Sequence, residues 1–340
     1  MVRRIKMAAA IAAALALVIG CSSQTSSENG TAIEEAIVKD GGENIVVGYS
    51  QIGSESDYRI ANTQSFKSVF TEDNGYYLLY EDAQQKQENQ LRAVRNFILQ
   101  NVDYIILDPI VETGWDAVFQ EAKAAGIPII LADRYVEASE DLYTCWVGSD
   151  FKQEGRRAAE WLLHYLKERG RDKEEIQIVT LQGTLGSSAQ IGRTKGFSEI
   201  LDKQDNWKML ERKSGEYTQA RGQEIMAEFL ENYPDIDVVI SENDNMTFGA
   251  IDAIKDAGKT CGPDGDIIML SFDAVRAALE AMRDGEIHAD FECNPLLGPE
   301  VEKVIRKLEA GEEVEKIQYV EETYYDYTMD LEEIMKTRIY

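Results

Sequence analysis

Residues 127–133, IPIILAD, and residues 267–273, IIMLSFD, are two apolar runs that each end in an aspartate. Continuous β-branched and aliphatic residues over this length are typical of strands buried on both faces of a parallel sheet. The two runs look like loose copies of one unit, one in each half of the chain. They predict two similar lobes and place an acidic side chain at the end of one strand in each.

Similar runs alternate with segments of helical period from Glu43 onward. Such alternation implies parallel strands with right-handed crossovers, an α/β fold of three layers in each lobe. The chain passes to its second lobe near residues 147–150. The expected strands are 45–49, 76–80, 104–107, 127–131, 145–147, 176–181, 208–212, 238–240, 267–272 and 287–291. The apolar helix stripes are Leu91, Val94, Ile98; Val118, Ala122, Ala125; and Ala158, Leu162, Leu166.

Composition narrows the function classes. The 340 residues suffice for about two domains. They carry 62 acidic against 35 basic residues, a net charge of -27 that repels phosphate backbones and speaks against a nucleic-acid partner. Cys145, Cys261 and Cys293 have no CxxC spacing, and the only histidines are His164 and His288, so no metal site is indicated and at most one disulfide can form.

Residues 1–20 have the pattern of an export signal. A basic start is followed by the apolar run 7–19, which is short for a membrane span. The sequence Val18-Ile19-Gly20-Cys21 resembles a bacterial lipobox, which implies cleavage before Cys21 and a lipid on its sulfur; an ordinary signal with a chance cysteine is the alternative. We expect residues 21–42 to form a flexible tether and the folded part to be extracytoplasmic, anchored to the outer face of the cell membrane.

Charged side chains follow many of the predicted strands. Ligands of open parallel sheets bind at this edge, beyond the carboxyl ends of the strands. Three carboxylates and three guanidiniums that nearly offset one another suit an uncharged ligand covered in hydroxyls, since each hydroxyl both donates and accepts. Two tyrosines offer aromatic faces for a sugar ring. The residues are Glu55, Asp133, Asp273, Arg59, Arg134, Arg193, Tyr58 and Tyr217.

Some residues at the strand ends also have a purely structural interpretation. Asp108 and Asp150 could cap the helices that follow them, and so could the segment 242–244. Arg134 could pair with a neighbouring carboxylate. The recurrence of polar residues at so many strand ends favours a binding site.

Longer stretches resemble a known family. They are VGYSQIGSESDYR (47–59), DAQQKQENQLRAVR (82–95), DPIVETGW (108–115), LADR (131–134), LQGTLGSSAQIGR (181–193), SGEYTQARGQEIM (214–226), ENDNMTFGAIDAIKDAG (242–258) and SFD (271–273). In order and spacing they resemble galactofuranose-binding periplasmic proteins of ABC sugar importers, and more broadly the type I periplasmic binding proteins. The likeness covers about residues 44–340.

This resemblance implies two Rossmann-like lobes joined by a three-strand hinge, formed by 43–147 plus 294–317 and by 148–293 plus 318–340. It implies a monomer that binds a galactofuranose- or galactose-like aldose between the lobes and delivers it to an ABC permease, with no cofactor and no catalysis. The ligand-binding residues implied by the matching motifs are Glu55, Tyr58, Arg59, Asp133, Arg134, Arg193, Tyr217, Asn243 and Asp273.

Two positions depart from the family pattern. Asp57-Tyr58 stands where the relative has a smaller residue followed by tryptophan, and Cys293 stands in the last crossover where ribose binders place a glutamine. Because of these two departures, the motifs alone do not determine which sugar is bound.

Two other function classes remain to be weighed. A sugar-sensing subunit that docks on a membrane histidine kinase or chemoreceptor would share the fold. A glycoside hydrolase would need paired carboxylates with one raised pKa, whereas we expect the nearby guanidiniums to lower the carboxylate pKa values.

Overall fold

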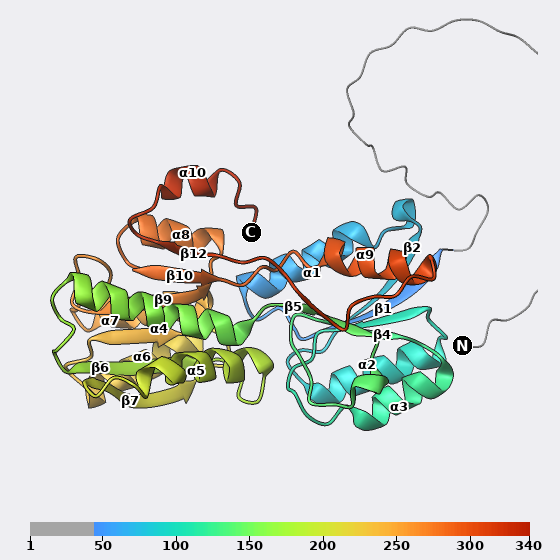
Figure 1. Ribbon diagram of the computed structural model, residues 1–340, viewed down its shortest axis with the longest axis horizontal. Coiled ribbons are helices and arrows are strands. Elements are labelled where there is room, and N and C mark those ends of the chain that lie inside the picture. The colour runs from blue at the N-terminus through green and yellow to red at the C-terminus, as the bar shows by residue number, and fades with distance from the viewer. Residues whose placement is uncertain (1–43) are drawn as a thin grey trace, which may run out of the picture. The chain divides into compact units, whose positions relative to one another are not determined.

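The computed structural model describes residues 44–340, which belong to one compact unit. They form two six-stranded sheets with helices on both faces of each (Figure 1). The predicted signal, the Cys21 lipidation site and the whole predicted tether lie outside the described residues. Within residues 44–340, no helix combines the length and the apolar character needed to cross a membrane.

The first sheet has the strand order β11-β5-β4-β3-β1-β2, and all its pairs are parallel. Its strands are β1 (Ile45–Gln51), β2 (Tyr76–Asp82), β3 (Tyr104–Leu107), β4 (Ile129–Ala132), β5 (Cys145–Gly148) and β11 (Ile317–Tyr319). Its helices are α1 (Asp57–Val69), α2 (Gln87–Leu99), α3 (Asp116–Ala125) and α9 (Gly298–Glu309), with short 3-10 turns η1 (Glu72–Asn74) and η2 (Glu140–Leu142).

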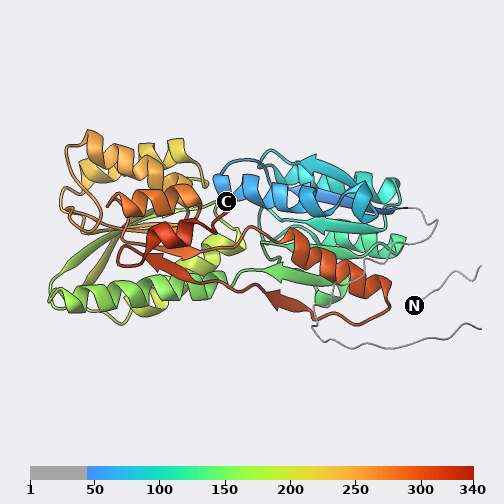
Figure 2. The same cartoon turned by 90° about the horizontal axis from the view of Figure 1, so that it is seen from above.

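Alternate strand residues of this sheet enter two separate cores. Ile105 and Ile129 pack with α2 and α3, whereas their neighbours Ile106 and Ile130 pack with α1 and α9. Seen from above, α1 and α9 lie side by side (Figure 2). A strand with both faces covered needs apolar residues at every position, which is why β3 and β4 read as continuous apolar runs.

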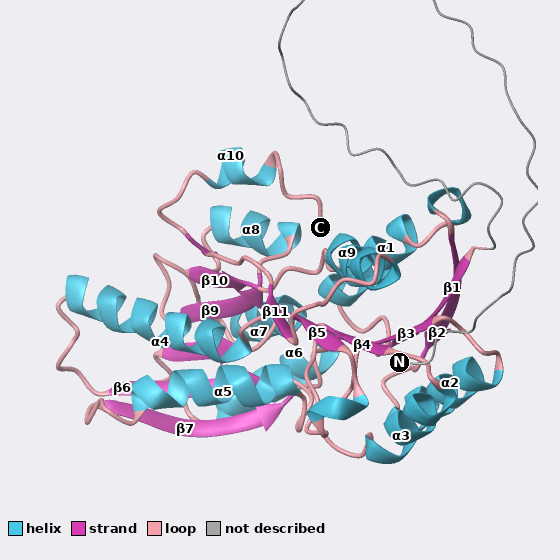
Figure 3. Ribbon diagram, turned by 45° about the vertical axis from the view of Figure 1, so that its right-hand side comes forward, coloured by secondary structure: helices cyan, strands magenta, loops and turns pink. Residues whose placement is uncertain are grey.

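The second sheet repeats the arrangement in the order β12-β10-β9-β8-β6-β7 (Figure 3). Its strands are β6 (Ile176–Gln182), β7 (Trp207–Ser214), β8 (Val238–Ser241), β9 (Ile268–Asp273), β10 (Ala289–Glu292) and β12 (Tyr324–Asp326). Helices α4 (Phe151–Glu168) and α5 (Ser188–Leu201) pack on one face. The other face carries α6 (Gln219–Asn232), α7 (Asp244–Asp256), α8 (Arg276–Arg283) and α10 (Leu331–Met335).

All ten predicted strands are present, and the two-lobed α/β prediction is confirmed. Strand β4 starts at Ile129 instead of residue 127, because Pro128 has no N–H to give to a ladder. Strands β11 and β12 were not predicted. Strictly parallel pairing was wrong at one edge, where β12 runs antiparallel to β10 with Phe291 opposite Tyr324.

The chain crosses between the sheets three times: after β5, after β10 and between β11 and β12. The expected crossings at 147/148 and 317/318 fall within β5 and β11, both of which belong wholly to the first sheet. The one disulfide that the sequence allowed among Cys145, Cys261 and Cys293 is not formed, because all three are buried free thiols.

Candidate functional site

Side chains from both lobes line one polar cavity at the carboxyl ends of the strands, with about 280 Å³ of space between atoms, including its open mouth. All nine residues predicted to bind ligand lie on its wall. The full lining is Glu55, Ser56, Tyr58, Arg59, Asp133, Arg134, Phe151, Ala189, Arg193, Tyr217, Asn243, Asp273 and Cys293.

Arg59 is the centre of the first-lobe wall. Ser56 caps α1 by accepting a hydrogen bond from the Arg59 backbone N–H, which fixes the start of the helix that carries the guanidinium. The buried guanidinium reaches three carboxylates: Nη2 lies 2.6 Å from Asp133 Oδ2, Nη1 lies 3.3 Å from Asp108 Oδ2, and Nε lies 3.3 Å from Glu55 Oε1. Burial alone would lower the pKa of Arg59, but the three carboxylates outweigh it and raise that pKa well above its ordinary value.

Asp108 lies behind Arg59, outside the cavity wall. Its side chain is fully buried, and Oδ2 accepts a hydrogen bond from the Tyr49 hydroxyl at 3.0 Å. It therefore belongs to the buried charge network and does not serve as the helix cap considered above. Burial raises the pKa of Asp108 to about 8, and Arg59 only partly opposes this.

Arg193 plays the corresponding part in the second lobe. Its Nε donates to Glu154 Oε2 at 2.7 Å, its Nη2 to Asp273 Oδ1 at 3.2 Å, and its Nη1 to the carbonyl of Glu242. The guanidinium also lies 5.0 Å from the Phe272 ring centroid. Each lobe thus presents one buried arginine whose position is fixed by carboxylates.

The expected lowering of carboxylate pKa values was wrong for this half of the site. Burial raises the pKa of Glu154 to about 7 and that of Asp273 well above its ordinary value, in both cases against the attraction of Arg193. The reason is that removing a carboxylate from water costs more than one shared guanidinium returns.

Arg134 and Tyr217 form a contact between the lobes. Arg134 donates to the Ile110 carbonyl at 3.1 Å, and its guanidinium lies 5.0 Å from the centroid of the Tyr217 ring. This uses one of the five N–H donors of the arginine and leaves others for the cavity. Tyr217 packs so closely on Gly183 that a Cβ there would lie 1.8 Å from the ring.

The backbone at the site adopts conformations that ordinary side chains rarely take. The φ angle is 58° at Asp133, 63° at Tyr217 and 107° at Asp273. Such angles cost free energy and gather where a structure needs a side chain in a particular direction. Three of the nine predicted residues have them.

The capping interpretations were partly right. Asp150 caps α4 by accepting from the Gln153 N–H at 2.9 Å. Asn243 caps α7 through Met246 N at 3.0 Å, while its Nδ2 donates to the Tyr217 carbonyl at 3.1 Å and its side chain still lines the cavity. The Asn243 side chain therefore both caps α7 and lines the cavity.

Sequence reasoning did not single out Glu154, although a signal was present. Glu154 precedes Ala158, Leu162 and Leu166 at intervals of four, so it continues the apolar stripe of α4 onto its buried face. A carboxylate in such a stripe is a candidate partner for a buried cation. Phe151 and Cys293 were not assigned to the ligand site either.

The two added acids change the charge balance less than their number suggests. Carboxyl groups with pKa values of about 8 and about 7, as in Asp108 and Glu154, hold protons for much of the time at neutral pH. Asp108 and Glu154 therefore add less negative charge beside Arg59 and Arg193 than two ionised carboxylates would.

Residues 45–291 match a family model whose description is "Periplasmic binding protein domain". The chain belongs to the periplasmic binding protein family. This periplasmic binding protein is 38% identical over 299 residues to the galactofuranose-binding protein YtfQ of Escherichia coli K12, covering 86% of the chain and 92% of that protein.

Two solved structures are also similar to this chain in sequence and fold. A Mycobacterium smegmatis protein crystallised with β-D-fucofuranose is 40% identical, with a TM-score of 0.82 over 86% of this chain and 95% of that one. The periplasmic binding protein component of the arabinose ABC transporter of Shewanella sp. ANA-3, bound to α- and β-L-arabinofuranose, is 37% identical, with a TM-score of 0.79 and the same coverage.

Proposed function

We propose that this protein binds a single uncharged aldose in its furanose form, in the cavity between the lobes, and delivers it to an ABC permease. The observation that carries the proposal is the pair of buried arginines, Arg59 and Arg193, each held by carboxylates on a wall of one cavity. Carboxylates accept from sugar hydroxyls while guanidiniums donate to them, and neither sign of charge dominates.

The energetics suit a transport protein. Charge-assisted hydrogen bonds contribute roughly 1.5–3 kcal/mol each, so three or four of them supply about 5–12 kcal/mol, a large part of what micromolar binding at roughly 8 kcal/mol requires. Tyr58, Phe151 and Tyr217 line the same cavity and offer aromatic faces to the C–H side of a ring.

The relatives favour a five-membered ring. The three described above are named for, or were crystallised with, galactofuranose, fucofuranose and arabinofuranose. One of them is a component of an ABC transporter, which favours import over the sensory alternative. Binding without bond cleavage is what the family does, so the carboxylates are ligand and arginine partners here, not an acid and base.

The remaining parts of the proposal concern location and assembly. We place the protein outside the cytoplasm, held at the membrane by a lipid on Cys21 and acting as a monomer. The export-signal pattern and the lipobox-like segment 18–21 support the anchor.

Calorimetric titration tests the proposal with L-arabinose, D-galactose and D-fucose, each of which supplies its own furanose fraction, and with methyl β-D-galactofuranoside as a locked ring. We expect one site per chain, and tighter binding of methyl β-D-galactofuranoside than of free D-galactose, because only a fraction of the free sugar has the furanose form. Galactose 6-phosphate is the charged control. Saturable binding of the phosphate with no binding of the neutral sugars would overturn the proposal.

A further inference from the structure

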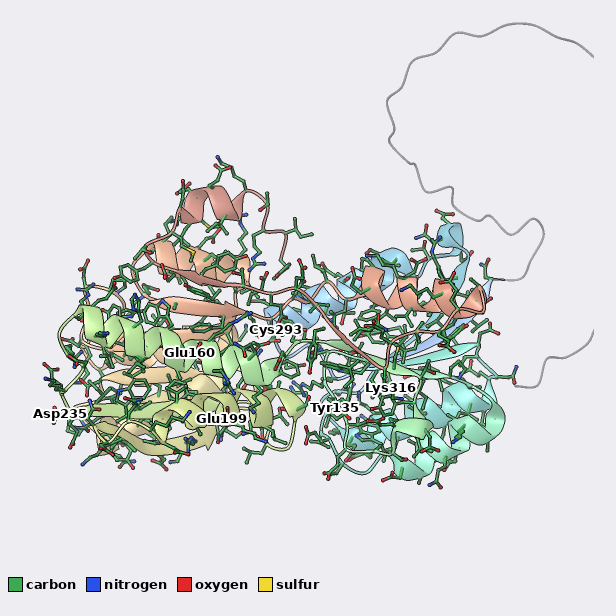
Figure 4. All side chains as sticks on the ribbon, in the orientation of Figure 1. Tyr135, Glu160, Glu199, Asp235, Cys293 and Lys316 are labelled. Atoms are coloured by element: carbon green, nitrogen blue, oxygen red, sulfur yellow. The ribbon has the colours of Figure 1, made fainter. Side chains whose placement is uncertain are left out.

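Three potential metal ligands meet where the chain crosses between its lobes. Glu154, Cys293 and Glu322 each offer one ligand atom, and the three atoms lie within 4.8 Å of one another. Cys293 directly follows β10 and lies between the two lobes, where it is labelled in Figure 4, and Glu322 lies in the last crossover between β11 and β12. Glu154 comes from the first turn of α4, directly after the first crossover.

One carboxylate oxygen of the cluster is buried and has no hydrogen-bond partner. Glu154 and Cys293 are each only 2% exposed. Glu154 Oε2 is engaged by Arg193 at 2.7 Å, whereas the buried Oε1 has no hydrogen-bond partner. A buried, unpartnered carboxylate oxygen beside a second carboxylate and a sulfur is costly unless a cation or a proton joins them.

The other two ligands are already oriented. Glu322 Oε1 accepts from the Asn294 N–H at 2.8 Å and from the Ser149 hydroxyl at 2.5 Å. The same hydroxyl lies 3.3 Å from Cys293 Sγ. Ser149 thus ties the thiol and the carboxylate together, as partners outside the coordination sphere do in metal sites.

We propose that Glu154, Cys293 and Glu322 bind one divalent transition-metal ion of the zinc type. Zn²⁺ takes thiolate and carboxylate ligands together, and a set of three leaves its fourth position to water. Ca²⁺ and Mg²⁺ prefer oxygen alone, so the thiol discriminates against them. Two carboxylates and a thiolate around a dication, with Arg193 beside them, leave the site nearly neutral.

An ion bound here would link the second and third crossovers, through Cys293 and Glu322, to Glu154 on α4. It would therefore act on the hinge between the two lobes. Glu322 is half-buried, whereas Glu154 and Cys293 are buried.

Titration of the purified, metal-free chain with Co²⁺ and Zn²⁺ provides the test. We expect one ion per chain, a thiolate-to-cobalt charge-transfer band in the near ultraviolet, and displacement of Co²⁺ by Zn²⁺ but not by Ca²⁺. Cys293→Ala should abolish the band, and Glu322→Gln should weaken Zn²⁺ binding by at least about 10-fold. Glu322→Gln keeps the shape of the side chain and is the second variant if Cys293→Ala does not fold.

Cys145→Ala and Cys261→Ala are the matched controls, because both thiols are buried and free but lie outside the cluster. Each should leave stoichiometry and spectrum unchanged. Absence of saturable Zn²⁺ binding would overturn the proposal in favour of a shared proton. A cobalt band that survives Cys293→Ala would overturn it as well.

Discussion

Replacing Arg59 by methionine is the sharpest test of the buried charge network. Methionine keeps much of the volume of the side chain but removes every donor. Glu55, Asp108 and Asp133, which now lie 3.3, 3.3 and 2.6 Å from guanidinium nitrogens, would lose their common partner. The change therefore acts on both the fold and the ligand.

The magnitude follows from burial. Truncating one partner of a buried charged pair costs about 2–5 kcal/mol, which corresponds to roughly 30- to 4,000-fold in Kd at 1.4 kcal/mol per decade. We expect sugar affinity to fall by about two orders of magnitude, within that range, and the free energy of unfolding to fall by about 3–5 kcal/mol. Calorimetry gives the first quantity and urea unfolding the second.

Arg95→Met is the matched control. Arg95 also pairs with a carboxylate, Glu121 Oε2 at 2.8 Å, but the two side chains are 47% and 43% exposed. Exposed pairs contribute about 0–1 kcal/mol, so neither affinity nor stability should change appreciably. Unchanged sugar affinity in folded Arg59→Met would refute the role assigned to Arg59.

Three further predictions concern the anchor, the pH dependence and helix packing. Cys21→Ser should move the protein from the membrane to the soluble fraction on cell fractionation without changing sugar affinity; continued membrane association would contradict lipidation. Burial raises the folded pKa of Glu154, Glu242 and Asp290 to about 7, against about 4 in the unfolded chain, so the folded state holds extra protons in that window. The free energy of unfolding should therefore fall as pH rises from 6 to 8, by up to about 1.4 kcal/mol per pH unit and group, and greater stability at pH 8 in urea unfolding would contradict this. Gly196→Ala would place a Cβ 2.0 Å from the Lys152 carbonyl and should cost about 1–3 kcal/mol by forcing α5 away from α4; an unchanged Tm would show that the helices are not so tightly packed.

Much of the fold could be predicted because both sheets are covered on both faces. Strands such as β3 and β4 must then be apolar throughout, and the two aspartates that end IPIILAD and IIMLSFD mark the edge at which parallel strands present their ends. The edge strands β11 and β12 have no such signal. They are three residues long, and β11 is exposed at both ends.

The site was predictable to the extent that each residue follows a strand. Asp133 and Asp273 are of this kind, and both lie on the cavity wall. The partners of the arginines were harder to find, because Glu154 reaches Arg193 from a different helix and only a packed structure brings them together. The raised pKa values of Asp108, Glu154 and Asp273 depend on burial, so a count of acidic and basic residues could not predict them.

We expect both lobes to contact one uncharged sugar ring. A crystal structure grown with L-arabinose or methyl β-D-galactofuranoside tests it most directly. We expect a single ring in the cavity, its hydroxyls within hydrogen-bond distance of Arg59 and Asp133 from one lobe and of Arg193 and Asp273 from the other. A sugar bound to one lobe only, or elsewhere on the surface, would contradict the account.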